Sequence, residues 1–197
     1  MPSTQPSLST TPDLTFGPMG RAMAEPMDSD LLKAMQDHLN MERQAHTAYF
    51  ATTIWFAERE LRGFARYFRH ESQGEQEHAE KFGDYLLARG QTIELHQIDV
   101  PRQAWTSAED VMASSFLMES DLTSSLQQLY AIAERSGDIR STVFLDPMVE
   151  QQVKSEHEFA HLYGRVRFAD HQSAALLIID NELDNGQHQP ATLQDNN

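Results

Sequence analysis

The sequence predicts an all-α protein built as a four-helix bundle with a short fifth helix near the C-terminus. Three features predict it: long segments with apolar residues at helical spacing, short turns that join these segments in pairs, and one long connection between the pairs. The long segments are expected at residues 29–58, 60–88, 107–136 and 138–169, and the short one at 173–183. A segment of about 30 residues is roughly 45 Å long at a rise of 1.5 Å per residue, which suits a bundle.

Local signals set the ends of the segments. Asp28 or Ser29 is a suitable N-cap for the first helix, and Thr106-Ser107, followed by Glu109 and Asp110, resembles the start of the third. Gly90 follows the second helix, where a residue without a Cβ can adopt the left-handed conformation that ends many helices. Pro147 lies inside the fourth segment, where it predicts a kink or an altered first turn.

The connections predict the topology. The joints after the first and third segments are short, so each pair of helices forms an antiparallel hairpin. The link from Arg89 to Trp105 contains Pro101 and is long enough to run back along the bundle before the third helix begins. The expected arrangement is therefore two hairpins joined by one long crossover.

Composition limits the domain organisation. A chain of 197 residues fits one domain, expected at 29–183 between a flexible N-terminal extension, residues 1–28, and a flexible C-terminal tail, residues 184–197. The extension is rich in Pro, Ser and Thr and lacks the basic start and apolar middle of a secretory signal, so we expect a cytoplasmic protein.

Charge and cysteine content exclude several classes of function. The chain has no cysteine, which excludes thiolate metal sites, thiol nucleophiles and disulfides. Its 15 basic against 30 acidic residues give a formal net charge of −15, which repels nucleic acid and anionic membranes and attracts cations. No apolar run approaches the length needed to span a bilayer, so neither nucleic acid nor membrane is an expected partner.

Each of the four long segments carries a polar residue at the centre of its apolar stripe. These residues are Glu42, Glu75 with His78 one turn later, Glu119 and Gln152. The spacing between Glu42 and Glu75 (75 − 42 = 33) equals that between Glu119 and Gln152 (152 − 119 = 33), so both hairpins place them near mid-height. A buried carboxylate is costly unless a partner neutralises it, and one pair of metal ions would serve all of them.

The types of candidate ligand limit which metal ions the site suits. Glu75 and His78 stand at i and i+3 and can hold the same ion, and carboxylates with one imidazole suit Fe(II), Mn or Zn. The simpler alternatives are a buried acid paired with an Arg for Glu42 and a hydrogen-bonded core histidine for His78. No Arg or Lys lies on the inner stripes near mid-height, which argues against the first alternative.

Two further residues, Gln152 and Tyr49, each have two alternative roles. Gln152 either coordinates metal or, since a neutral amide is a poor ligand, only hydrogen-bonds a ligand carboxylate. Tyr49, two turns from Glu42 on the same face, either hydrogen-bonds a metal ligand, with possible redox use, or simply packs in the core.

Other histidines and acids are sorted by the direction in which they point. The second Glu-x-x-His pair, Glu158 and His161, is rejected as a ligand pair because His161 points nearly opposite Gln152. Glu156 points inward one turn beyond Gln152 and is a possible extra ligand. The remaining candidates, expected at the surface or between helices rather than at a metal, are His38, His46 and His157.

The chain resembles the ferritins. The matching segments are NMERQAHTAYF (40–50), GEQEHAEKFGDYL (74–86), SFLMESDLTSSL (115–126) and VEQQVKSEHEFAHLYGRV (149–166). The resemblance covers most of residues 29–183 and implies the ferritin-like bundle, a hollow shell of 24 identical subunits and a di-iron ferroxidase centre with two Fe per subunit. The centre would be formed by Glu42, Glu75, His78, Glu119 and Gln152, with Tyr49 as the nearby tyrosine.

The sequence departs from the ferritin pattern at several positions, and these departures limit which family features are expected here. Gln152 and Ser155 stand where a bacterioferritin has Glu-x-x-His, so no haem is expected. Ser155 also replaces a carboxylate that helps bind a third iron in many bacterial ferritins, and Gly74 replaces a glutamate common in animal ferritins. Accessory or transit sites would then use Glu71 and Glu150, with Asp146 as the pore acid near the start of the fourth helix.

The leading expectation is iron storage and detoxification. Fe(II) would be oxidised by O2 or H2O2 at the di-iron centre and deposited as ferric oxyhydroxide in the cage. Two rivals are considered: a di-metal oxidoreductase acting on an organic substrate, which needs an apolar pocket of substrate size, and a non-enzymatic cage-forming bundle, which would leave the inward acids unsatisfied. Small-cage proteins with a metal site between subunits rank lower, because they lack this intrachain set.

Overall fold

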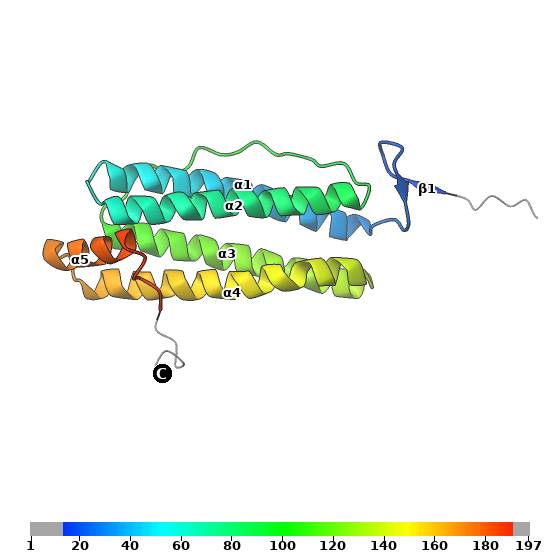
Figure 1. Cartoon of the computed structure of the whole chain (residues 1–197). Coiled ribbons are helices and arrows are strands. Elements are labelled where there is room, and N and C mark those ends of the chain that lie inside the picture. Colours follow the sequence, from blue (N-terminus) through cyan, green and yellow to red (C-terminus); the bar gives the residue numbers. More distant parts are fainter. Residues whose placement is uncertain (1–13, 191–197) are drawn as a thin grey trace, which may run out of the picture.

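The computed structural model describes residues 14–190 and is a bundle of long helices arranged as two antiparallel pairs (Figure 1). The helices are α1 (Ser29–Ala57), α2 (Arg62–Ala88), α3 (Ala108–Arg135), α4 (Ile139–Phe168) and the short α5 (Ser173–Asp184). Every end lies within two residues of its predicted position. The predicted all-α bundle with a short fifth helix is confirmed.

The helix ends follow the sequence signals. The Asp28 carboxylate accepts hydrogen bonds from the backbone N–H groups of Asp30 and Leu31, at 2.9 and 3.1 Å, so Asp28 rather than Ser29 is the N-cap. Ser107 caps α3, and Gly90 after α2 has a φ of 75°. The helix α4 is α-helical throughout, including Pro147, which removes one backbone hydrogen bond without ending the helix.

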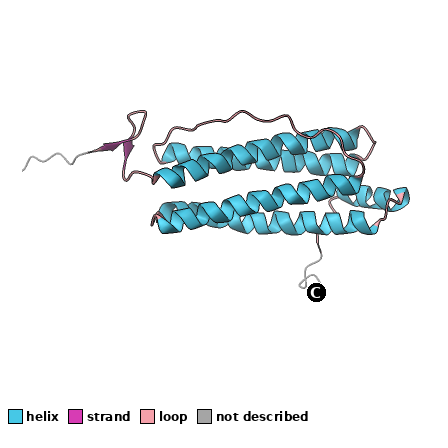
Figure 2. Ribbon diagram, turned by 180° about the vertical axis from the view of Figure 1, so that it is seen from behind, coloured by secondary structure: helices cyan, strands magenta, loops and turns pink. Residues whose placement is uncertain are grey.

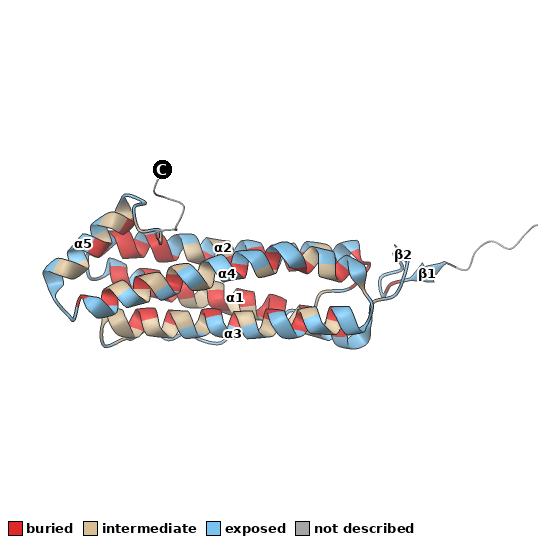
Figure 3. Ribbon diagram, turned by 90° about the horizontal axis from the view of Figure 1, so that it is seen from below, coloured by how far each residue is buried: buried red, intermediate tan, exposed pale blue. Residues whose placement is uncertain are grey.

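Two apolar clusters fill the space between the helices. Figure 3 shows that buried positions recur along each of the long helices. One cluster surrounds the α1–α2 turn and is built of stacked aromatic rings such as Phe56, Phe64 and Phe68. The other occupies the opposite end and includes Phe82 and Leu129. The predicted polar residues lie between the two clusters, so apolar side chains enclose them from both ends of the bundle.

The crossover from α2 to α3 runs along the outside of the bundle, over the α1–α2 pair (Figures 1 and 2). Side-chain amides of Gln36, Asn40 and Gln44, spaced one turn apart on α1, accept hydrogen bonds from backbone N–H groups of residues 94–99 at 2.6 to 2.9 Å. Asn40 and Gln44 also donate to carbonyl oxygens of the same stretch. This ladder of amides on α1 supplies partners for a backbone that has no secondary structure of its own.

In its described part, the N-terminal extension forms a short two-stranded hairpin. The sequence-based prediction, a flexible segment over residues 1–28, did not include this hairpin. Strands β1 (Thr15–Phe16) and β2 (Ala22–Met23) pair antiparallel, and Arg21 donates to the Leu87 carbonyl at the end of α2 at 2.7 Å. A Cβ on Gly17 would lie 2.1 Å from the Gly90 carbonyl oxygen, so the hairpin packs closely on the bundle. These contacts join residues distant in sequence, and local patterns therefore do not reveal them. Residues 1–13 lie outside the described part of the chain.

The C-terminal part packs on α2. A Cβ on Gly63 would lie 1.8 Å from the Asp180 carbonyl oxygen, so only glycine allows α5 to approach this closely. Asp180 also accepts a hydrogen bond from the Phe64 backbone N–H at 2.9 Å. Of the predicted flexible tail, residues 191–197 lie outside the described part. Over residues 14–190, no helix is both long enough and apolar enough to cross a membrane.

Candidate metal centre

Three predicted ligands from the α1–α2 hairpin meet at mid-height. Glu42 of α1 and Glu75 and His78 of α2 each offer one ligand atom, and these atoms lie within 4.8 Å of one another. His78 Nδ1 lies 2.9 Å from Glu75 Oε2 and 3.8 Å from Glu42 Oε2. All three residues are buried. The antiparallel pairing brings Glu42 opposite Glu75, and the helical turn from 75 to 78 brings the imidazole to the same face.

The α3–α4 hairpin adds a carboxylate and an amide. Glu119 is buried, and its Oε2 accepts a hydrogen bond from Gln152 Nε2 at 2.9 Å. Its Oε1 accepts a hydrogen bond from the Tyr49 hydroxyl. The Tyr49 ring also packs against Phe68 and Phe159. Tyr49 therefore both packs in the core and hydrogen-bonds a predicted ligand, and its redox use stays a prediction. Gln152 does hydrogen-bond a predicted ligand carboxylate, and its direct coordination of metal stays a prediction.

The buried acids have no cationic side chain of the usual kind beside them. Within residues 14–190, Glu42 pairs only with His38 and His78, and Glu75 only with His78. Neither Arg nor Lys forms an ion pair with Glu42, Glu75 or Glu119 in this part of the chain. Imidazole is therefore the only titratable base that compensates the carboxylates.

The pKa values of the cluster diverge in consequence. Burial opposes ionisation of Glu42, but the nearby imidazoles of His38 and His78 outweigh it and lower the pKa of Glu42 to about 2. Burial also favours a neutral His78, yet the adjacent carboxylates of Glu42 and Glu75 raise its pKa to about 10. Burial, together with the charge of Glu42, raises the pKa of Glu75 well above the usual range. An arriving cation must therefore displace protons from the cluster.

Two polar atoms of the cluster lack partners. His78 Nε2 and Glu42 Oε2 are fully shielded from solvent, and neither has a hydrogen-bond partner within the described chain. Buried polar atoms without partners are rare and costly. His78 presents Nδ1 to Glu42 and Glu75, so Nε2 lies on the other side of the ring. An ion bound between the carboxylates and the imidazole would satisfy Glu42 Oε2, and such a donor set suits Fe, Mn or Zn.

His38 lies inside the bundle, between α1 and α3, and not at the surface. It is 1% exposed, and its Nε2 lies 3.0 Å from Glu42 Oε1. That it is not a metal ligand stays a prediction. The signal for this position was the i, i+4 spacing to Glu42 on one helix face. A buried histidine is tolerated here because both ring nitrogens face polar groups, the other being Ser125 Oγ at 2.9 Å.

The predicted accessory acids lie apart from the central group. Glu71 is half-buried one turn before Glu75, where burial and the charges of Glu158 and Glu119 raise its pKa to about 8. Glu156 is half-buried and accepts a hydrogen bond from a threonine of α3. The exposed acids have other partners: Glu150 pairs with Lys154, and Asp146 accepts from Tyr130. Roles of these four acids in iron transit stay predictions.

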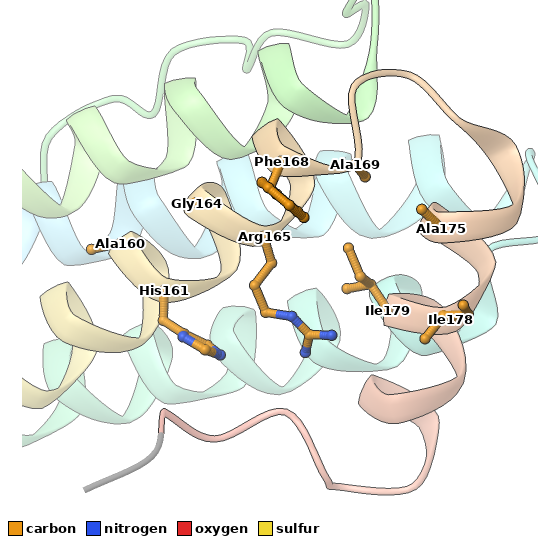
Figure 4. Close-up of a pocket in the computed structure, with 9 residues that line it drawn as sticks. All are labelled: Ala160, His161, Gly164, Arg165, Phe168, Ala169, Ala175, Ile178 and Ile179. Atoms are coloured by element: carbon orange, nitrogen blue, oxygen red, sulfur yellow. The ribbon is translucent and has the colours of Figure 1, made fainter. Parts of the chain in front are cut away.

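The other histidines lie outside the central group. His157 is exposed, and His46 is half-buried between α1 and α2 with Nδ1 2.7 Å from the Ser72 carbonyl oxygen. Glu158 lies 3.0 Å from His188 Nε2. His161 lines a pocket between α4 and α5 with a volume of about 510 Å³ (Figure 4). None of the residues lining this pocket belongs to the Glu42, Glu75 and His78 group.

A model of the ferritin-like domain matches residues 32–169 of the chain. The chain belongs to the ferritin family. This ferritin is 28% identical to a bacterial non-heme ferritin of Staphylococcus aureus (strain USA300) over 158 residues, which cover 80% of this chain and 95% of that one. Membership of the family supports a function in iron storage, and the buried Glu42, Glu75 and His78 group is able to bind metal.

Solved structures agree with the relationship. A humanized archaeal ferritin has 25% sequence identity and a TM-score of 0.79 over 85% of this chain and 99% of that one. A PmFTN variant from crystals soaked in iron has 29% identity and a TM-score of 0.75 over 78% of this chain and 98% of that one. These likenesses extend over nearly the whole length of both related chains.

Proposed function

We propose that this ferritin oxidises Fe(II) at a centre formed by Glu42, Glu75, His78 and Glu119 and stores the product in a homo-oligomeric cage. Two Fe ions per subunit would occupy the centre, and the cage would contain 24 subunits, as in the family it resembles. The observation that carries the proposal is the buried Glu42, Glu75 and His78 group, with its two polar atoms that lack partners. Iron is the substrate and cargo in this proposal.

The reaction balances with O2 as the oxidant. Two Fe(II) ions each give up one electron, and O2 takes both electrons and two protons to become H2O2. H2O2 is the alternative oxidant, and its reduction by two electrons and two protons yields water. Carboxylate oxygens favour the higher charge of Fe(III), and protons displaced from His78 and Glu75 on iron binding are available locally.

The α3–α4 side would hold the second ion through Glu119, with Gln152 either coordinating or hydrogen-bonding. Tyr49 holds Glu119 in place through its hydroxyl. Burial, followed by the charge of Glu119, raises the pKa of Tyr49 well above its usual range, so the hydroxyl keeps its proton. A phenol in this position is suited to supply a further electron together with its proton.

The decisive experiment uses stopped-flow absorbance after addition of two Fe(II) per chain to the aerobic, iron-free protein. Glu75→Ala should abolish the fast oxidation phase and leave assembly, followed by size exclusion, unchanged. Glu77→Ala is the matched control, since it removes an exposed acid from the same helix and should keep the fast phase. Fast oxidation by Glu75→Ala would refute the assigned centre.

A further inference from the structure

We propose that His38 is a positioning residue that orients Glu42 for metal binding through a relay from Ser125. This inference rests on the proposed metal centre and assigns part of its construction to a residue outside the ligand set. His38 and Glu42 are both on α1, whereas Ser125 comes from α3, so the relay joins the two hairpins at the centre.

The His38 ring is held on all sides. Its Nδ1 lies 2.9 Å from Ser125 Oγ, and its ring centroid lies 4.8 Å from that of Phe82. Its Nε2 lies 3.0 Å from Glu42 Oε1 and has no other partner within residues 14–190. The two atoms are within ion-pair distance, but the contact does not meet hydrogen-bond geometry in this structure.

The chemistry of the three groups fixes their roles. Glu42 Oε1 can only accept a hydrogen bond, so a bond to His38 requires the ring proton on Nε2. Nδ1 is then left to accept from the Ser125 hydroxyl, which lies 2.9 Å away. The second oxygen of the same carboxylate, Oε2, has no hydrogen-bond partner and lies 3.8 Å from His78 Nδ1 on the side of the metal centre. One oxygen of Glu42 is therefore held by His38, while the other is free for an ion.

A role as a direct ligand is the competing possibility for His38. His38 does not belong to the group whose ligand atoms all lie within 4.8 Å, which contains only Glu42, Glu75 and His78 among the described residues. It contacts the opposite oxygen of Glu42 instead. Polar groups that hold metal ligands in this way typically contribute about 10- to 100-fold to metal affinity.

The test measures binding of Co(II) to the iron-free protein by its visible absorption, which reports coordination without any turnover. The relevant signal is the part that Glu75→Ala removes. His38→Ala should weaken this binding by about 10-fold or more, and His38→Gln should restore most of it, because a glutamine amide can donate to Glu42 but is a poor ligand. Ser125→Ala should give a smaller loss, about 3-fold, because Nε2 keeps its partner while the ring loses its anchor.

His46→Gln is the matched control. It replaces another α1 histidine, one turn after Glu42, that contacts Ser72 rather than a predicted ligand, and should leave Co(II) affinity unchanged. Unchanged affinity in His38→Ala would overturn the relay, and equal losses in His38→Ala and His38→Gln would instead indicate direct ligation. If His38→Ala fails to assemble, the Co(II) affinities of His38→Gln and Ser125→Ala still distinguish the relay from direct ligation. Absence of the signal from the wild-type protein would count against the proposed centre itself.

Discussion

The two hairpins contribute to the centre in different ways. The α1–α2 hairpin supplies Glu42, Glu75 and His78, a compact group in which charge is compensated by imidazole. The α3–α4 hairpin supplies Glu119, whose oxygens are taken by neutral donors, the Tyr49 hydroxyl and the Gln152 amide. One half therefore has unpartnered atoms ready for an ion, whereas the other must exchange hydrogen bonds for metal bonds. We expect the first ion to bind on the α1–α2 side.

The largest expected effect comes from removing His78 on the α1–α2 side, with Gln152 as the matching change on the α3–α4 side. His78→Ala should weaken the tighter of two Zn(II) binding steps by on the order of 100-fold or more, because it removes a direct ligand of the compact group. Gln152→Ala should weaken only the second step, by about 10-fold or less, because an amide contributes mainly through its hydrogen bond to Glu119. Isothermal titration calorimetry of the iron-free protein separates the steps. Equal effects on both steps would show that the two halves are equivalent.

A second prediction concerns the contact that joins the hairpins away from the centre. Arg89 at the end of α2 donates two hydrogen bonds to Asp138, at 3.0 and 2.7 Å, and both side chains are at least nine-tenths buried. Asp138→Asn should lower the free energy of unfolding by about 2 kcal/mol, because it leaves the Arg89 charge without its partner near the bundle end. Urea unfolding of the iron-free protein at neutral pH measures this loss.

The same pair predicts a dependence on pH. Burial opposes ionisation of Asp138, but the Arg89 hydrogen bonds outweigh it, so its pKa is below the ordinary value of 3.8. A depressed pKa means that the stabilisation is fully present above the unfolded-state pKa and is lost as pH falls through the lower, folded-state pKa. The stability difference between wild type and Asp138→Asn should therefore shrink below about pH 4. A difference that stays constant down to pH 3 would exclude this ion pair as the cause.

The smallest expected effect tests the link between Tyr49 and Glu119. Tyr49→Phe keeps the ring that packs against Phe68 and Phe159 and removes the hydroxyl. The free energy of unfolding should fall by only about 1 kcal/mol, the typical net value of one hydrogen bond. Affinity for the first Zn(II) should stay unchanged, because the hydroxyl contacts only the α3–α4 half. A loss in the first step would contradict the separation of the two halves.

Local sequence rules predicted most of the fold and the main site. Helix ends followed from caps such as Asp28 and from the turn at Gly90, and hairpin geometry brought Glu42 level with Glu75. Both results depend on residues close in sequence or related by simple helical spacing. The contact of His38 with Glu42 was not predicted, because the general rarity of fully buried histidines outweighed the position of His38 one turn before Glu42.

Features that depend on contacts between distant residues could not be predicted from local sequence patterns. The hairpin at residues 15–23 has strands of two residues each and is held by the far end of α2, so no local period marks it. The pairing of Arg89 with Asp138 joins residues 49 positions apart. Such contacts are determined only once the two hairpins have docked.

The ladder of amides on α1 also bears on the order in which the chain folds. The α1–α2 hairpin closes through a short turn and is expected to form early, since contacts near in sequence cost little loop entropy. Residues 94–99 can then align along Gln36, Asn40 and Gln44, which directs the chain back toward the start of the bundle before α3 forms. Glu119 consequently reaches the other carboxylates only in the final docking of the second hairpin. Repulsion between Glu119 and the buried acids of the first hairpin opposes that last step, and a metal cation bound between them would favour the closing of the bundle around it.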